Sequence, residues 1–320
     1  MLSTLSTILA AIGRRGTAGF ALSIVLGLAL PQLSAIARPV LPVTIFCFTI
    51  MVFLRADLSI IAGLVRRPGR LTASVLWLVV VPPLLVGGLI AAVGPANLDP
   101  GLLLGLAIMG AAPPIMSSPA IAILYGFEPS LIIASVLLVT MMSPAIAPWL
   151  VDWLAGQAVP LDPSILMLRL VLFVGGALVV ALALRRWLGK ARVQALKAEF
   201  DGFGVVMYFV FAIAAMDGVT AAAIRDPKLV AMFLAAAFGM SMVGIVLGLA
   251  ALRFVPLPDR FILGYGTGHR NMGLLVAALG AGVPETTYLY FAIAQFPIYL
   301  MPWLLSPLAR AISRHVAQEQ

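Results

Sequence analysis

Residues 264–273 read Gly-Tyr-Gly-Thr-Gly-His-Arg-Asn-Met-Gly, which places His269, Arg270 and Asn271 inside an otherwise apolar stretch near the C-terminus. A charged side chain at the centre of a membrane span costs about 2.5–3.5 kcal/mol on insertion scales. Such a residue therefore usually serves a ligand, an ion path or a partner. The glycines around it predict an unwound helix, because they permit unusual torsions and close backbone approach; they are Gly264, Gly266, Gly268 and Gly273.

A second interrupted stretch, GAAPPIMSSP at residues 110–119, carries Pro113, Pro114 and Pro119. Proline lacks a backbone donor and clashes with the preceding turn, so this stretch predicts a broken helix. Irregular backbone in a bilayer must be covered by protein or water. We expect the freed carbonyls, with Ser117 and Ser118, to face a ligand or ion. The alternative is a proline kink that neighbouring helices satisfy.

The composition is that of an integral membrane protein: 62% of residues are apolar and 10% charged, with a mean hydropathy of +1.13. The net charge of +8 is expected to lie in cytoplasmic loops, so it predicts the lipid bilayer rather than nucleic acid as its partner. One cysteine and two histidines exclude a disulfide and a multi-histidine metal site. We expect no cofactor and no enzymatic activity, because no nucleophile–base or metalloprotease motif is present.

Apolar runs predict ten membrane spans near 17–36, 39–54, 71–93, 101–125, 129–154, 165–187, 203–223, 228–252, 261–282 and 286–309. Residues 1–16 are expected to form an interfacial helix and 311–320 a cytoplasmic tail. Fifteen Lys and Arg residues then lie on the inner side and three on the outer side: Arg38, Arg225 and Lys228. This asymmetry predicts that both termini are cytoplasmic.

The two halves of the chain resemble each other. Ala147-Pro-Trp-Leu150 recurs as Met301-Pro-Trp-Leu304, 154 residues later, and the same offset carries Pro113 to Thr267. Five spans per copy is an odd number, so the second copy inserts upside down. We therefore predict an all-α polytopic protein with two inverted five-helix repeats, 17–154 and 155–310. Spans four and nine are its broken crossover helices.

Three ionisable residues are candidates for binding an anion or for coupling transport to protons. Arg270 offers a planar fork for a carboxylate or phosphate. The alternative is structural pairing with Asp217, the one acid well inside a predicted span, or with helix C-terminal carbonyls. His269 and Asp217 are candidates for proton coupling, and the alternative for His269 is a hydrogen-bonded core histidine.

The chain resembles the bile acid:sodium symporter family in its bacterial ten-span form, over about residues 17–310. The resemblance lies in GAAPPIMSSPAIAILYGFEPSLIIASVLLVTMMSPAIAP (110–148), FLRADLSIIAGLVRRPGR (53–70) and GYGTGHRNMGLL (264–275). It implies a panel domain of spans 1, 2, 6 and 7 and a core domain of spans 3, 4, 5, 8, 9 and 10. It further implies alternating-access transport of an organic anion across a bacterial inner membrane.

The chain departs from the family at the sodium site. Aligned on Asn271, the family's glutamate position is Gly266 and its glutamine position is Arg270. The span-four asparagine is Pro119 and the span-three glutamine is Trp77. These changes remove most side-chain oxygen ligands and put a fixed cation where sodium would bind. We therefore expect a sodium-independent carrier of a bile-acid-like or small carboxylate. The alternatives are a proton-coupled carrier and a non-transporting receptor of the same fold. The sequence leaves the substrate and the oligomeric state open.

Overall fold

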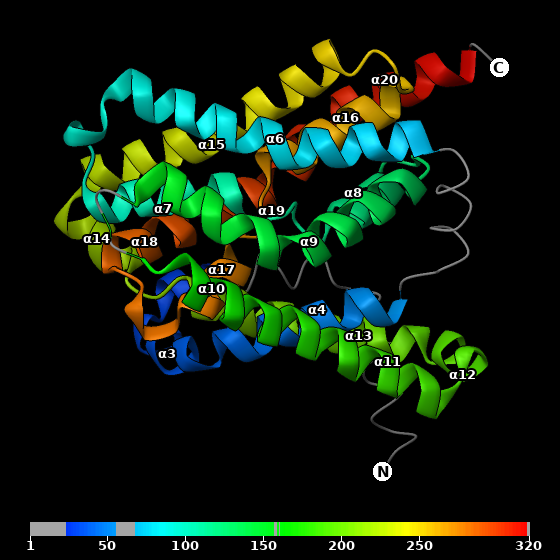
Figure 1. Cartoon of the computed structure of the whole chain (residues 1–320), viewed down its shortest axis with the longest axis horizontal. Coiled ribbons are helices and arrows are strands. Elements are labelled where there is room, and N and C mark those ends of the chain that lie inside the picture. The colour runs from blue at the N-terminus through cyan, green and yellow to red at the C-terminus, as the bar shows by residue number, and fades with distance from the viewer. Residues whose placement is uncertain (1–23, 56–67, 157–158, 160, 319–320) are drawn as a thin grey trace. The chain divides into compact units, whose positions relative to one another are not determined.

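The computed structural model describes residues 24–55, 68–156, 159 and 161–318, and these residues form helices joined by short turns (Figure 1). Within them, six helices are long and apolar enough to cross a bilayer: Pro31–Leu54, Pro68–Val93, Ser130–Ala155, Pro163–Leu188, Lys197–Arg225 and Pro227–Ala251. A bent pair, Glu285–Leu304 with Ser306–Val316, is a further candidate. The chain is an all-α, multi-pass membrane protein. The expected interfacial helix at 1–16 lies outside the described residues.

The chain divides into two compact units. The first holds described residues 24–55 and 171–231. Its elements are α3 (Pro31–Ala37), η1 (Arg38–Val40), α4 (Leu41–Arg55), η3 (Val171–Gly175), α11 (Gly176–Leu188), α12 (Lys190–Ala195), α13 (Lys197–Ala215) and α14 (Val219–Arg225). Helix α4 packs against η3, α11 and α13, partly through aromatic contacts of Phe46 with Phe173 in η3 and of Phe48 with Tyr208 in α13.

The predicted boundary between spans one and two is wrong. Residues 37–38 lie inside the continuous stretch Pro31–Leu54, because Pro39 sits in the first turn of the 3-10 helix η1 and interrupts nothing. The chain instead turns at Leu30, whose φ of −124° and ψ of 73° are not helical. Pro31 explains this turn, since the residue before a proline is disfavoured in the helical region.

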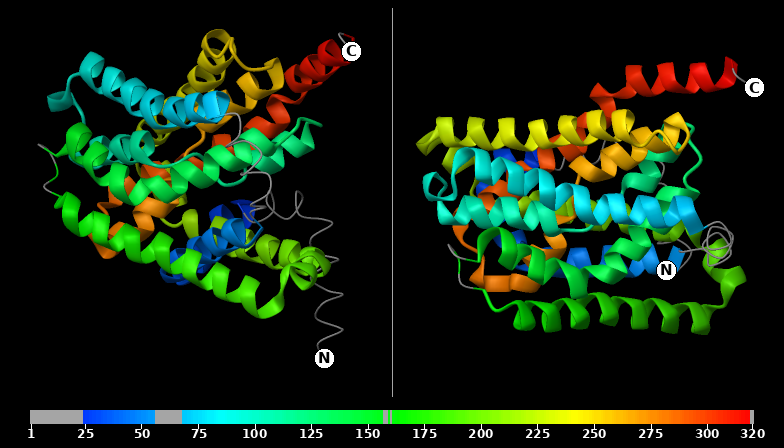
Figure 2. Two further views of the ribbon diagram at one scale, coloured as in Figure 1. Left: turned by 45° about the vertical axis from the view of Figure 1, so that its right-hand side comes forward. Right: turned by 45° about the horizontal axis from the view of Figure 1, so that its top comes forward.

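The second unit holds described residues between 68 and 170 and between 232 and 318. Its helices are α6 (Pro68–Val93), α7 (Pro100–Ala111), α8 (Ser118–Leu124), α9 (Ser130–Ala155), α10 (Pro163–Leu170), most of α15 (Pro227–Ala251), α16 (Leu257–Gly268), α17 (Met272–Leu279), α18 (Glu285–Ile293), α19 (Gln295–Leu304) and α20 (Ser306–Gln318), with 3-10 turns η2 (Pro95–Asn97) and η4 (Gly280–Gly282). Helices α6, α7 and α9 pack against one another. Helix α20 is bent by 46° relative to the preceding stretch Glu285–Leu304, which comprises α18 and α19. Figure 2 shows α20 projecting near the C-terminus.

Both predicted breaks are present in this unit. The first separates α7 from α8 at residues 112–117, and the second separates α16 from α17 at residues 269–271. Pro113 and Pro114 lie in the first break. Pro119 instead lies in the first turn of α8, where its missing donor costs nothing.

The glycines of α16 serve close packing rather than special torsions. Gly264, Gly266 and Gly268 have ordinary negative φ angles, so the torsion argument was wrong for them. A methyl group at Gly268 would come 2.6 Å from Cα of Ser241, and one at Gly248 would come 2.5 Å from Cα of Gly264. Helices α15 and α16 therefore touch backbone to backbone, a contact that only small residues allow.

Candidate functional site

The two breaks cross each other and pair through their backbones. The N–H of Ile115 donates to the carbonyl of His269 at 2.9 Å, and the N–H of Asn271 donates to the carbonyl of Pro113 at 2.8 Å. Pro114 and Arg270 thus form an isolated antiparallel bridge. The helices α7 and α16 end at this crossing, and α8 and α17 begin there. Unwound backbone groups are thereby satisfied inside the unit, as a lipid environment requires.

Arg270 lies at the centre of the crossing, with 3% of its surface exposed. Its Nη1 donates to the carbonyl of Gly266 at 3.2 Å, and its Nη2 donates to the carbonyl of Leu78 on α6 at 3.0 Å. Within the described part of the chain, no carboxylate pairs with Arg270, and its Nε has no hydrogen-bond partner. The alternative of pairing with helix-end carbonyls therefore holds for Gly266, which lies in the last turn of α16.

The Leu78 carbonyl is available because residue 82 is a proline. In a helix the carbonyl of Leu78 would accept from the N–H of residue 82, and Pro82 has none. At two further places in this unit, a proline inside a helix leaves a carbonyl free and a side chain donates to it. Pro144 frees the carbonyl of Thr140, which accepts from the Ser143 hydroxyl at 2.7 Å.

Pro302 likewise frees the carbonyl of Ile298, which accepts from the Tyr265 hydroxyl at 3.4 Å. At Pro82, Pro144 and Pro302 the freed carbonyl is thus taken by a side-chain donor. Sequence reasoning missed Leu78 as a partner of Arg270. Pro82 was the local signal, but it does not say which donor replaces the lost N–H.

His269 is buried, with 1% of its surface exposed, and its ring stacks on Tyr265 with centroids 3.9 Å apart. Its Nδ1 lies 2.9 Å from the carbonyl of Tyr265. A carbonyl only accepts, so Nδ1 carries the proton of the neutral ring and Nε2 presents a lone pair. Nε2 has no hydrogen-bond partner among the described residues, and Pro297 lines a small pocket together with His269.

Three of the positions compared with the family's sodium site, 77, 266 and 270, lie close together. The indole N–H of Trp77 donates to the hydroxyl of Thr267 at 2.8 Å, and Thr267 in turn donates to the carbonyl of Leu263. A side chain at Gly266 would meet Leu78 and Pro114 at 3.5 Å, an ordinary packing distance. Positions 77, 266 and 270 therefore lie around the carbonyls of Leu263, Gly266 and Leu78, which accept these side-chain hydrogen bonds.

Several hydroxyls in this unit are buried without a partner. Ser118 at the start of α8 is fully buried, and its Oγ makes no hydrogen bond within the described part of the chain. Ser117 precedes it and makes no capping bond. The hydroxyls of Ser135 and Thr140 on α9 likewise make no hydrogen bond to any described residue, and sequence reasoning did not single them out. An unmade bond of this kind costs about 1–3 kcal/mol.

Asp217 belongs to the first unit and pairs with Arg38 at 3.0 Å. The alternative in which Asp217 neutralises Arg270 is therefore wrong. Asp217 lies between α13 and α14, next to Gly218, whose φ of +78° marks an interruption of the helix. The Asp217 side chain is 17% exposed and that of Arg38 is 32% exposed, so this pair is only partly buried.

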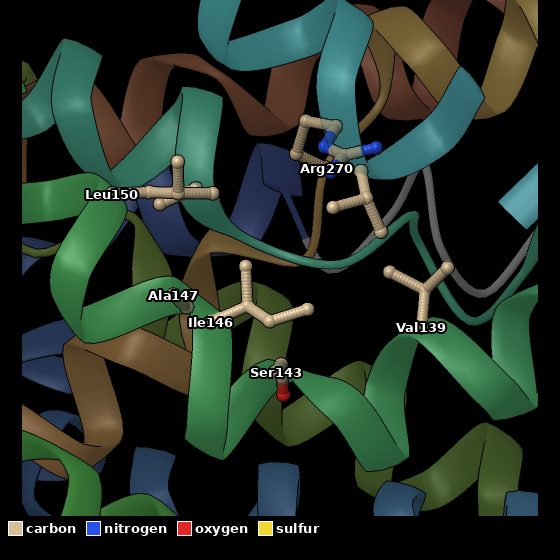
Figure 3. Close-up of a pocket in the computed structure, with 8 residues that line it drawn as sticks. Val139, Ser143, Ile146, Ala147, Leu150 and Arg270 are labelled. Atoms are coloured by element: carbon tan, nitrogen blue, oxygen red, sulfur yellow. The ribbon is translucent and has the colours of Figure 1, made fainter. Parts of the chain in front are cut away.

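A small pocket adjoins Arg270 (Figure 3). Its enclosed part has room for about one water molecule. It is lined by residues of α6, α7 and α9 together with Arg270: Val79, Ala111, Val139, Ser143, Ile146, Ala147 and Leu150. A second small pocket adjoins His269 and includes Met109, Ser241 and Pro297. No protein-family model and no curated protein matches this chain.

Proposed function

We propose that this chain is a secondary carrier of an organic anion, with the ten-span inverted-repeat fold of the bile acid:sodium symporter family. The observation that carries the proposal is the antiparallel pairing of Pro114 with Arg270. It joins two broken helices at residues far apart in the sequence, and such crossings form substrate sites in inverted-repeat transporters. Chance kinks would not need to meet backbone to backbone.

The division into two units supports alternating access. The first unit holds the described parts of proposed spans 1, 2 and 7 and most of span 6, which would form the panel. The second unit holds the crossing and spans 3, 4, 5, 9 and 10 with most of span 8, which would form the core. With the turn at Leu30, the first span ends by residue 29. The carrier would work in a bacterial inner membrane with both termini in the cytoplasm.

Arg270 would take the place of the coupling ion. Its guanidinium donates to carbonyls of α16 and α6, much as a bound cation would attract them. The charge is part of the chain, so it cannot leave during a transport cycle. The carrier would therefore run without sodium.

The test is flux in proteoliposomes. Proteoliposomes that contain the purified protein should take up labelled organic acids saturably, and protein-free liposomes should not. Arg270→Ala should abolish uptake, whereas Arg253→Ala, at an exposed arginine after α15, should leave it intact. Ligand binding without flux through the wild-type protein would overturn the carrier and favour a receptor of the same fold.

A proton-coupled carrier is the second candidate, and the observation that favours it is the Nε2 of His269, which makes no hydrogen bond to any described residue. A proton there would create an imidazolium whose Nδ1–H donates to the Tyr265 carbonyl and whose Nε2–H is free for a ligand or water. His269→Gln keeps a polar side chain but cannot titrate. If uptake driven by an inward proton gradient survives this change, the histidine is not the coupling group.

A further inference from the structure

We propose that one end of the first unit, formed by α12 and the adjoining ends of α11 and α13, binds the phosphate headgroups of anionic lipids. Residues 185–197 contain five basic residues and no acidic one: Arg185, Arg186, Lys190, Arg192 and Lys197. Glu199 and Asp201 follow, so residues 185–201 carry a net charge of +3. A basic cluster directly after an apolar span is typical of segments that bind anionic lipids.

The cluster lies where an apolar span ends. The stretch Pro163–Leu188 is long and apolar enough to cross a bilayer, and its last turn carries two of the basic residues. Gly189 follows with a φ of +78°, a conformation that glycine adopts readily, so the chain turns directly into α12. Helix α12 packs against α11 and α13, as Figure 1 shows. The basic residues are therefore gathered at one end of the unit.

The exposed face of α11 leads from acyl chains to headgroups. Val179, Leu182 and Arg186 are exposed, and their spacing of three and four residues places them on one face of the helix. In a membrane protein the apolar part of such a face contacts acyl chains. Arg186 lies about 6 Å further along the helix axis than Leu182. This step carries its guanidinium towards the headgroup layer.

Trp187 lies at the same level. It is 81% exposed, and its ring makes no hydrogen bond or ring contact with a residue in the described ranges. Tryptophan is enriched at the membrane–water interface, where its ring sits at the level of the headgroups. An exposed tryptophan between Arg186 and the turn at Gly189 therefore indicates contact with lipid.

Three cations of this surface are available to a ligand. Arg186, Arg192 and Lys197 are exposed, and none of them makes a hydrogen bond or an ion pair with another described residue. Val193 and Leu196 are half-buried, so α12 turns its apolar side chains inward and Arg192 outward. A guanidinium fork matches two oxygens of a phosphate, and an ammonium adds a point charge.

The charge of this surface favours phosphatidylglycerol over phosphatidylcholine. Both lipids carry a phosphate, but the quaternary ammonium of choline neutralises it and would lie beside the basic side chains. Each Lys or Arg near an anionic membrane surface strengthens binding about fivefold. Salt should weaken the preference, because the side chains are exposed and screened by ions.

The test titrates the full-length protein in an uncharged detergent with phosphatidylglycerol or phosphatidylcholine of identical acyl chains. Native mass spectrometry measures the affinity of the first bound lipid. Phosphatidylglycerol should bind at least tenfold more tightly than phosphatidylcholine. Arg186→Gln, Arg192→Gln and Lys197→Gln should each reduce this preference severalfold, and the triple variant should abolish it. Because these side chains are exposed, every variant should melt like the parent without lipid.

Arg225→Gln is the matched control. Arg225 is exposed at the opposite end of the helical stretch Lys197–Arg225, so this variant should keep the preference of the parent. An equal loss in Arg225→Gln would overturn the proposal, because overall charge would then be the cause. Equal affinity of the parent for both lipids, or a preference that survives in the triple variant, would overturn it as well.

Two further measurements identify the ligand as a lipid. Inorganic phosphate at the concentration of the lipid should not displace phosphatidylglycerol, and displacement would overturn the proposal in favour of a soluble anion. Phosphatidylglycerol with brominated acyl chains should quench the part of the fluorescence that Trp187→Phe removes. Absence of this quenching would contradict the position of Trp187 at the interface. These measurements involve no flux, so their failure leaves the proposed carrier to its own test.

Discussion

The Nη2 of Arg270 donates a hydrogen bond of 3.0 Å to the carbonyl of Leu78, 192 residues away in the sequence. That carbonyl has no helical donor because residue 82 is Pro82. A proline inside α6 and a charge in the break between α16 and α17 are thus two halves of one interaction. The first prediction follows from this pairing.

Pro82→Ala should release Arg270 from α6. The new N–H of residue 82 would compete for the Leu78 carbonyl, so Arg270 would lose one of its two partners. Hydrogen bonds to charged groups contribute about 1.5–3 kcal/mol. The free energy of unfolding should therefore show a coupling of about 1 kcal/mol or more between Pro82→Ala and Arg270→Ala. Pro83→Ala, one residue along the same helix, is the control. Additive effects for both prolines would show that the pairing contributes nothing measurable.

Sodium should be irrelevant to this protein. Gly266, Arg270, Pro119 and Trp77 offer no side-chain oxygen for a cation, and the guanidinium already holds the Gly266 and Leu78 carbonyls. Replacing sodium by potassium or choline should leave uptake and melting temperature unchanged. A saturable rise of either quantity with sodium concentration would contradict this prediction.

Gly248→Ala should destabilise the contact between α15 and α16. The added methyl group would come 2.5 Å from Cα of Gly264 and 2.7 Å from the carbonyl oxygen of Arg260. These atoms belong to the backbone, so the helices must separate, at a cost of about 1–3 kcal/mol. Gly239→Ala, on the same helix with open space around it, should be neutral or slightly stabilising. Thermal unfolding of both variants in one detergent compares them directly.

The membrane orientation can be read by labelling. Asp99 and Glu285 lie at one end of the second unit, since the Thr287 hydroxyl donates to the Gly101 carbonyl beside them. In a Cys47→Ala background, cysteines at 99 and 285 should react with an impermeant reagent from outside the cell. A cysteine at Gly189 should react only after permeabilisation. The opposite pattern would invert the proposed sidedness.

Asp259 should make stability depend on pH. It lies ahead of proposed span nine, and burial raises its pKa to about 6, with Glu128 adding to the shift and Arg70 opposing it. A carboxyl whose pKa is higher in the folded state stabilises the fold when protonated, and this contribution is lost as pH rises from about 4 to 6. Asp259→Asn should therefore raise stability at pH 7.

The gain from Asp259→Asn should be about 1 kcal/mol, because water screens this partly exposed group. It should shrink towards zero as pH falls below 3.8, the ordinary pKa of an aspartate, because Asp259 is then protonated in both states. Glu128→Gln should move the midpoint of the parent's pH dependence downward, since it removes a neighbouring negative charge. Melting temperatures between pH 4 and 8 measure both effects. A gain that is equal at every pH would rule out titration of Asp259 as its cause.

Local chemistry made much of the fold predictable. Helices of about 25 residues in the structure match predicted spans at Pro68–Val93, Ser130–Ala155 and Pro227–Ala251. The length of an apolar membrane helix is set by the thickness of the bilayer that it crosses. The turn at Leu30 was missed because Pro31 lies inside an apolar run, so the hydropathy profile does not change at this position.

The sequence by itself determined that this is a helical membrane protein with two broken segments and a charge in one of them. Those features follow from composition and from proline and glycine, which act on their own neighbours. Only the tertiary structure decided that Trp77 bonds to Thr267, 190 residues away, and that Arg270 takes the Leu78 carbonyl. It also decided that Gly264 and Gly268 face α15 whereas Gly266 faces Leu78 and Pro114. A freed carbonyl requires a hydrogen-bond donor, and a glycine face allows another backbone to approach closely. The packing of helices distant in sequence determines which group fills each of these positions.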